Sequence, residues 1–430
     1  MTGLDRRMKG MTESGTEHGA ADGTALLVRR VAVVDPATAQ VREQQAIRLT
    51  GGAIAEVTPD PGGPVTGTQL DGAGLFAVPG LIDCHVHAMS VSVSPDEQAD
   101  WYPSYVTARA AGNLRAMLDR GFTTVRDVGG ADAGLARAVA EDRLPGPRLI
   151  FGGKALSQTG GHGDGRPGGR DVYDPHYFVP TLNRVCDGVP DVRRAVRDEV
   201  RRGAHHIKLH ASGGCASPTD RLDSVQFSDE ELRAIVEEAA AARLYCAAHA
   251  YTAEAVSRAL RFGVRTIEHG NLVDEASVAL FTEHGAFYVP TLIAYTALVE
   301  DGPAAGLPEV TLAKARQVYA AGLRALELAD QAGVQIAYGS DLLGDLQRRQ
   351  SEEFGIRAAV QSPAHVLQGA TTVAARLLRL EGQVGTLAAG ARADLILTRH
   401  NPLGDIRPLA NPEQEVAVVI RSAVVATDRR

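Results

Sequence analysis

Six side chains of the sequence stand in or at the ends of apolar runs, and their types suit metal binding. Two of them, His85 and His87, close the run Leu-Ile-Asp-Cys with one residue between them. Strand alternation would point both imidazoles to the same face, where they can hold one divalent metal ion. The other four are Lys208, His249, His269 and Asp341. The set predicts a metal centre assembled from several strands.

Lys208 is the least ordinary member of this set. It stands inside the apolar run Ile-Lys-Leu, where an ammonium in a buried strand would carry a desolvation penalty with no evident partner. The chain uses lysine sparingly, since only Lys9, Lys154, Lys208 and Lys314 occur among 44 basic residues. Reaction of the amine with CO₂ would give N6-carboxylysine, an anionic group able to bridge two metals.

The segments that carry these residues alternate with helix-like segments rich in Ala, Arg and Glu. Eight strand-like runs follow one another: LIDCHVH, TTVRDVG, RLIFGGKAL, HHIKLHASGG, YCAAHAYT, RTIEHGN, AFYVPTL and VQIAYGSD. Continuous apolar runs are typical of parallel strands buried on both faces. Eight such units predict an α/β fold, a (β/α)₈ TIM barrel, whose chemistry gathers at the carboxyl ends of the strands. Helix-start signals support the pattern at Ser228 with Glu231 and at Ser362-Pro363.

Both ends of the chain have a strand-like texture without convincing helices. We expect them to pair into one small β-sandwich domain, residues 24–79 and 381–430, beside a barrel domain at 80–380. Residues 1–23 mix charged residues, Gly, Ser and Thr, which predicts a disordered tail.

Composition narrows the class of function. The formal net charge of −8 comes without a basic stripe, which argues against a nucleic-acid partner and favours a small-molecule substrate. The sequence has neither an export signal nor an apolar run of membrane-helix length, so we expect a cytoplasmic protein with no membrane partner. The cysteines are in no CxxC spacing and should be reduced thiols: Cys84, Cys186, Cys215 and Cys246. Since such barrels are often oligomeric, we also expect a homo-oligomer.

A family resemblance rests on the same motifs. HVH, IKLHASGG, AHAYT, IEHGN and GSD, in this order, resemble the binuclear amidohydrolases that carry a carboxylated lysine. The resemblance begins near residue 25 and includes GARADLIL near the carboxyl end. Within that superfamily, TGGHGD at 159–164 and the long segments on either side of IKLHASGG resemble the prolidase-like branch, that of Xaa-Pro dipeptidases and enzymes related to imidazolonepropionase.

The resemblance implies two divalent metal ions, with zinc expected, although imidazole and carboxylate ligands accept several ions. The implied ligands are His85, His87 and Asp341 for the first ion, His249 and His269 for the second, and carboxylated Lys208 as the bridge.

The implied activity is hydrolysis of an amide or peptide bond in a small carboxylate-bearing substrate, a Xaa-Pro dipeptide or an N-acyl amino acid, by a metal-bridging hydroxide. Asp341 would take the proton of the nucleophile and pass it to the leaving nitrogen. His162 of TGGHGD and Tyr251 after the second-metal histidine are expected to bind the substrate, one at its carbonyl and the other at its carboxylate. We count both with Asp341 as catalytic residues.

Each of these residues has a plainer interpretation when it is taken alone. His249 or His269 could be a core histidine bonded to backbone, and Lys208 could be an ordinary buried lysine in a salt bridge. Asp341 could cap the helix that follows it, and His162 could be an exposed histidine of a glycine-rich loop. The shared position at strand ends favours the metal centre over these separate explanations.

Neighbouring residues have less specific interpretations. Glu268 and Asn271 flank His269, and either orient it or simply end a strand. His205 and His206 precede the lysine strand and are expected at the surface.

The alternative function is a cyclic-amide hydrolase or deaminase similar to imidazolonepropionase or hydantoinase. Deaminases and imidazolonepropionases typically hold one metal without the lysine, so Lys208 counts against them. Hydantoinase-type enzymes keep the lysine but lack segments like GGHGD and HASGG. A non-catalytic scaffold is a third alternative, which the six filled ligand positions oppose.

Overall fold

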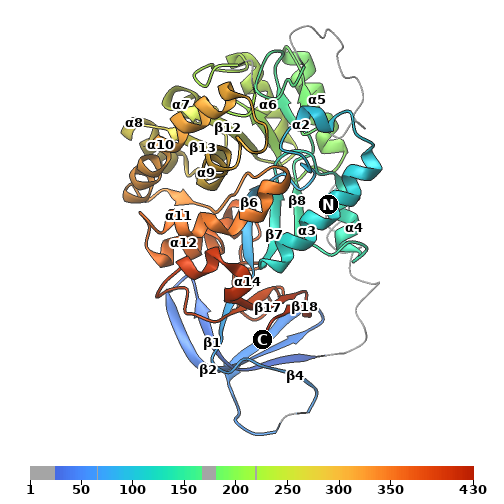
Figure 1. Cartoon of the computed structure of the whole chain (residues 1–430), viewed down its shortest axis with the longest axis vertical. Helices are drawn as coiled ribbons and strands as arrows, with labels where there is room; N and C mark the ends of the chain where they lie inside the picture. The colour runs from blue at the N-terminus through green and yellow to red at the C-terminus, as the bar shows by residue number, and fades with distance from the viewer. Residues whose placement is uncertain (1–24, 65, 167–180, 218–219) are drawn as a thin grey trace.

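The computed structural model describes residues 25–64, 66–166, 181–217 and 220–430. An α/β region lies above a sheet built from both ends of the chain (Figure 1). The disordered tail predicted for residues 1–23 lies outside the described residues. None of the described helices is both long and apolar enough to cross a membrane.

The sheet at the base of the molecule takes strands from both chain ends. Its strands are β1 (Leu26–Asp35), β2 (Gln40–Thr50), β3 (Ala53–Pro59), β4 (Thr68–Asp71), β5 (Phe76–Pro79), β16 (Leu395–Thr398), β17 (Val416–Arg421) and β18 (Val424–Asp428). Their order is β18-β17-β16-β5-β1-β2-β3, with β4 paired to β1. Strand β16 runs antiparallel to β5 and so joins the two ends, which share one apolar core. The predicted pairing of the two ends is therefore present, but the described strands form one hydrogen-bonded sheet rather than the two sheets of a β-sandwich.

The α/β region contains two parallel sheets. The first has the order β6 (Leu81–Val86), β7 (Phe122–Asp127) and β8 (Arg148–Phe151). The second has the order β10 (Asn183–Val185), β9 (Ala155–Ser157), β11 (Ile207–His210), β12 (Cys246–Thr252), β13 (Thr266–Leu272), β14 (Phe287–Val289) and β15 (Gln335–Ile336). Each of the eight strand-like runs predicted from the sequence overlaps at least one of these strands.

Backbone hydrogen bonds link the two parallel sheets. The segment after β15 bonds to β6, because the N–H of Cys84 donates to the carbonyl of Tyr338 over 2.8 Å. On the other side, β8 leads directly into β9, and the N–H of His205 donates to the carbonyl of Phe151 over 2.9 Å. These bonds place the ends of β6, β11, β12, β13 and β15 around one site.

Helices separate the strands along the chain. They are α2 (Pro95–Gln98), α3 (Pro103–Asp119), α4 (Ala133–Ala140), α5 (Val189–Arg201), α6 (Asp229–Ala241), α7 (Ala253–Arg261), α8 (Glu275–His284), α9 (Leu292–Glu300), α10 (Glu309–Gln331), α11 (Glu353–Arg357), α12 (Pro363–Gly369), α13 (Thr372–Leu377) and α14 (Pro412–Glu415), with 3₁₀ helices η1 (Gly344–Glu352) and η2 (Arg407–Ala410). Both predicted starts are confirmed: Ser228 and Glu231 form a capping box on α6, and Ser362 caps α12 with Pro363 in its first turn.

The prediction that His206 lies at the surface is wrong. Its side chain is fully buried and stacks on Tyr245, with ring centroids 5.5 Å apart. The ring also packs so close to Gly152 that an added Cβ there would lie 2.7 Å from it. His206 directly precedes β11, and its backbone already runs in line with that strand. Its side chain therefore points into the packed interior. The four cysteines are free and buried, in agreement with the expectation of thiols.

Candidate active site

Three of the predicted metal ligands converge at the ends of β6 and β15. The Nε2 atoms of His85 and His87 each lie 3.2 Å from the same carboxylate oxygen of Asp341. The Nδ1 atom of His85 is 2.8 Å from Glu268, and that of His87 is 2.9 Å from the carbonyl oxygen of Gly129. Since those oxygens accept hydrogen bonds, both Nδ1 atoms donate, and Nε2 of each ring is the nitrogen that faces Asp341 and that can bind a metal once it is deprotonated. The chemistry and spacing of this donor set fit one divalent ion.

A buried ion pair holds His85 in place. Arg126 and Glu268 are both fully buried, and Nη2 of Arg126 lies 2.8 and 3.0 Å from the two carboxylate oxygens of Glu268. Thr266 donates to the same carboxylate over 2.5 Å. Although burial favours the neutral acid, Arg126 and His85 hold the pKa of Glu268 well below its usual range. Glu268 thus orients His85. The sequence suggested His269 as its partner instead, because Glu268 and His269 are adjacent in the chain.

Asp127 shapes the loop that positions His87. Its carboxylate accepts hydrogen bonds from the backbone N–H groups of Ala88, Gly129 and Ala131 over 2.6 to 3.1 Å. Gly129 in turn offers the carbonyl that holds His87. The run Arg-Asp-Val-Gly-Gly at the end of β7 therefore positions His87, which directly follows β6.

Lys208 is buried, as its position in β11 predicted, with a side chain 2% exposed. Burial lowers the pKa of its amine to about 8, partly offset by the negative charges of Glu268 and Asp341. A lowered pKa increases the neutral fraction of the amine, which is the form that reacts with CO₂.

Three residues of this site have a strained backbone. His269, Thr291 and Asp341 have φ angles of 79°, 51° and 52°, in the left-handed region that residues other than glycine rarely adopt. Such conformations typically cost ~1–3 kcal/mol each and persist where the surroundings enforce them. The hydroxyl of Thr291 lies 2.8 Å from Nδ1 of His269, so one strained residue orients the other.

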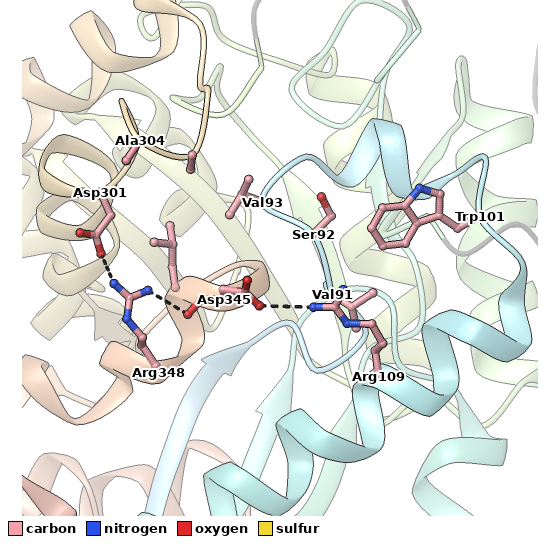
Figure 2. A pocket seen from close by; sticks show the side chains of 11 residues that line it. Val91, Ser92, Val93, Trp101, Arg109, Asp301, Ala304, Asp345 and Arg348 are labelled. Carbon is pink, nitrogen blue, oxygen red and sulfur yellow. Dashed lines mark hydrogen bonds and ion pairs between the residues drawn. The ribbon is translucent and has the colours of Figure 1, made fainter.

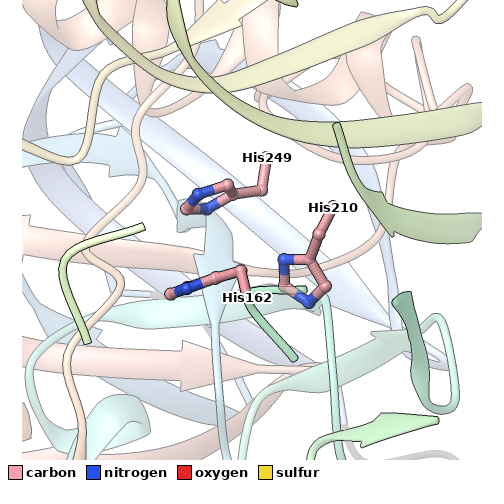
Figure 3. Close-up of side chains that lie close together, drawn as sticks. All are labelled: His162, His210 and His249. Carbon is pink, nitrogen blue, oxygen red and sulfur yellow. The ribbon is translucent and has the colours of Figure 1, made fainter. Parts of the chain in front are cut away.

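His249 lies in a second group of three ligands, which differs from the predicted pairing. The ring of His249 is next to that of His269, with centroids 4.6 Å apart. Among the described residues, however, the histidines whose ligand atoms gather with His249 within 4.8 Å are His162 and His210 (Figure 3). The structure thus brings His85, His87 and Asp341 together and places His162 and His210 beside His249.

His210 is a residue that sequence reasoning missed. It follows Lys208 by two positions in β11, so both side chains point to the same face of the strand. The alternation that paired His85 with His87 could have identified it.

Tyr251 packs against two of the predicted metal-binding histidines. Its ring packs against His249 and stacks on His269, with centroids 4.9 and 5.3 Å apart. Its hydroxyl accepts a hydrogen bond from Tyr295 over 2.9 Å, and burial raises its pKa well above the usual range. Tyr251 therefore keeps its proton and can donate it in a hydrogen bond. Cys215 is buried nearby with its pKa raised to about 12 by that burial, which agrees with a packing role.

A separate cavity of about 450 Å³ opens beside the loops that follow β6 and β15 (Figure 2). Trp101 lines it together with the ion pairs Arg109–Asp345 and Arg348–Asp301. None of the predicted site residues lines this cavity.

The comparisons with known proteins agree with this geometry. The sequence model of the amidohydrolase family matches residues 76–425. The chain belongs to the amidohydrolase family. It is a hydrolase by that membership, and it has relatives that act on amide or peptide bonds.

Three relatives of this amidohydrolase are informative. A crystal structure of a prolidase in complex with N-methylphosphonate-L-proline is 45% identical, covers 95% of this chain and 100% of its own, and superposes with a TM-score of 0.91. Ochratoxinase of Aspergillus niger is 33% identical over 353 residues, 78% of this chain and 72% of that protein. Imidazolonepropionase of Mycolicibacterium smegmatis is 26% identical over 403 residues, 87% of this chain and 89% of that protein.

Proposed function

We propose that this amidohydrolase cleaves the amide or peptide bond of a small substrate with a free carboxylate, of the Xaa-Pro dipeptide or N-acyl amino acid type. The observation that carries the proposal is the convergence of His85, His87 and Asp341 at one end of parallel strands. Lys208 is buried in β11, another strand of the same region. The similarity to a prolidase and to ochratoxinase supports the substrate class.

The closed (β/α)₈ barrel is the fold that this proposal uses. The backbone bonds that join the segment after β15 to β6, and the β8 side to β11, support closure. A barrel brings all strand ends to one face, where a site can draw ligands from several strands.

Two divalent ions would complete the centre, with zinc expected. His85, His87 and Asp341 would hold one, His249 and His269 the other, and Lys208 would bridge them as a carboxylate. Ions bound there would activate water and polarise the scissile carbonyl.

Asp341 is the residue that would move the proton. Although burial favours the neutral acid, the neighbouring imidazoles of His85 and His87 hold the pKa of Asp341 well below its usual range. It is therefore ionised at neutral pH and can accept the proton of the attacking water, then deliver it to the leaving nitrogen.

His162 and Tyr251 would grip the substrate. Both pack against His249, His162 stacked at a centroid distance of 4.4 Å and Tyr251 edge-on at 4.9 Å. Burial lowers the pKa of His162 to about 4, so it is a neutral hydrogen-bonding partner, and Tyr251 is a protonated donor. Together they can bind the carbonyl and the carboxylate of one small molecule.

A paired-substrate assay tests this proposal. Purified enzyme in bicarbonate buffer with zinc would be given Xaa-Pro dipeptides and N-acyl amino acids, each beside its C-terminal amide. We expect hydrolysis of the free acids, with much lower kcat/KM for the amides and for Tyr251→Phe acting on the acids. Equal rates for acids and amides would contradict a carboxylate-directed site.

The similarity to imidazolonepropionase keeps the cyclic-amide hydrolase or deaminase as a second candidate. Turnover of cyclic amides or amidines by a protein with one metal per chain would favour it. The homo-oligomer, the cytoplasmic location and the domain boundaries at 24–79, 80–380 and 381–430 stay predictions.

A further inference from the structure

The start of helix α9 is buried, and its backbone N–H groups need acceptors. Leu292, Ile293 and Ala294 are each at most 4% exposed. The N–H of Ala294 donates to the carbonyl of Thr291 over 3.2 Å. The N–H groups that precede it have no acceptor within the helix, as at every helix N-terminus. Because the position is buried, another part of the chain has to supply one.

Thr291, which directly precedes α9, is the residue type expected to do so. A threonine before a helix ordinarily caps it through its hydroxyl. Within the described chain, however, the side chain of Thr291 makes no capping bond to α9. Its hydroxyl lies 2.8 Å from Nδ1 of His269 instead, and its φ angle of 51° is outside the extended region of ordinary capping residues. Thr291 therefore orients His269 and does not cap its own helix.

The cap comes from Glu353, the first residue of α11. Its carboxyl oxygen Oε2 accepts the N–H of Ile293 over 2.7 Å, across 60 positions of sequence. Helices α9 and α11 are neighbours, and Ile356 of α11 packs against a buried cluster that contains Ile293 (Figure 1). Glu353 is fully buried, and burial raises its pKa to about 8, so at neutral pH it accepts this bond mainly as a neutral acid.

We propose that Glu353 is a positioning residue for the metal centre: by capping α9, it leaves the hydroxyl of Thr291 to orient His269. In the rotamer observed, the hydroxyl of Thr291 faces the imidazole and not the helix, so the two roles compete for one side chain. Glu353 thus acts on His269 through α9 and Thr291. The consequence for metal binding rests on the proposed function, in which His269 holds the second ion.

The experiment compares the full-length parent with two substitutions of Glu353. Glu353→Met keeps the length of the side chain but lacks a strong acceptor, whereas the amide oxygen of Glu353→Gln can still accept the N–H of Ile293. The control is Glu352→Met, at the neighbouring glutamate, whose side chain is 42% exposed. Glu353→Asp, with a carboxylate one methylene shorter, is the second variant that withdraws the cap.

Three measurements would be made on each protein. Crystal structures of the metal-free proteins would show which group the hydroxyl of Thr291 contacts. Chelator competition would measure the affinity for each zinc ion, and circular dichroism would check folding.

In Glu353→Met we expect the hydroxyl of Thr291 to turn from His269 to the N–H of Ile293, as an ordinary threonine cap. The affinity for the second zinc ion should fall ~10–100-fold, as when a ligand histidine loses its orienting partner. Glu353→Gln and Glu352→Met should keep the contact and the affinity of the parent. A hydroxyl that stays on His269 in both Glu353→Met and Glu353→Asp, or an unchanged affinity in both, would overturn the proposal.

A double variant separates this route from a general loss of packing. If Glu353 acts through Thr291, Glu353→Met should weaken zinc binding in the parent but no further in Thr291→Val. Losses that multiply in the double variant would overturn the proposal. Turnover tests the proposed function separately: if Thr291 turns away in Glu353→Met but the parent hydrolyses no carboxylate-bearing amide, the positioning role stands and the proposed function fails.

Discussion

Replacement of Glu268 by glutamine tests whether the buried ion pair positions the first metal ligand. In the parent, Glu268 accepts hydrogen bonds from His85, Arg126 and Thr266 over 2.5 to 3.0 Å, and no part of Glu268 or Arg126 is exposed. The amide keeps the shape but removes the charge, which leaves Arg126 buried without a counterion. Breaking one partner of such a pair destabilises proteins by ~3–5 kcal/mol.

The same change should weaken metal binding. Loss of a carboxylate that orients a ligand histidine typically lowers metal affinity ~10–100-fold. Chelator competition would measure the affinity and thermal denaturation the stability, with the exposed Glu283→Gln as control. The double variant Arg126→Met/Glu268→Gln removes both charges and should regain part of the stability but not the affinity. A Glu268→Gln protein with parental melting temperature and metal affinity would refute the reasoning.

Three further predictions follow from individual residues. Because burial lowers the pKa of Lys208 from 10.5 to about 8, CO₂ uptake by the metal-free protein, followed by ¹³C NMR, should rise as the pH passes about 8; a rise only near 10.5 would contradict this. Burial raises the pKa of Glu353 from 4.5 to about 8, so the stability that its neutral form contributes is complete below pH 4.5 and is lost as the pH rises through about 8. Glu353→Gln should remove that part of the decline in urea denaturation curves, and an unchanged pH dependence would count against it. Thr291→Val removes the hydroxyl that holds His269 and should lower affinity for the second metal ~10–100-fold, whereas Thr291→Ser should not; equal affinities would exclude this role.

Local patterns were sufficient to predict the strands and to single out His85, His87 and Asp341, which the structure brings together. Apolar runs closed by His85 and Asp341 indicated strand ends, and the two side chains meet there. The helix starts at Ser228 and Ser362 were equally local, because a cap and its partner lie within one turn.

Relations between distant segments were beyond the sequence pattern. Glu268 is next to His269 in the chain, yet it contacts His85, 183 positions away, because β6 and β13 face each other across the site. The grouping of His162, from a loop, with His249 likewise depends on the path of the chain in space. Nothing in the sequence signals the positive φ of Thr291, because threonine rarely adopts the left-handed conformation.

The most direct test of the central claim is the number of metals per chain in the parent and in Lys208→Ala, both purified in bicarbonate buffer with zinc. Elemental analysis would count the ions, and mass spectrometry under non-denaturing conditions would detect CO₂ on the parent. We expect two metals in the parent and a sharp loss in Lys208→Ala. One metal in both proteins would contradict the bridged centre and favour the mononuclear deaminase.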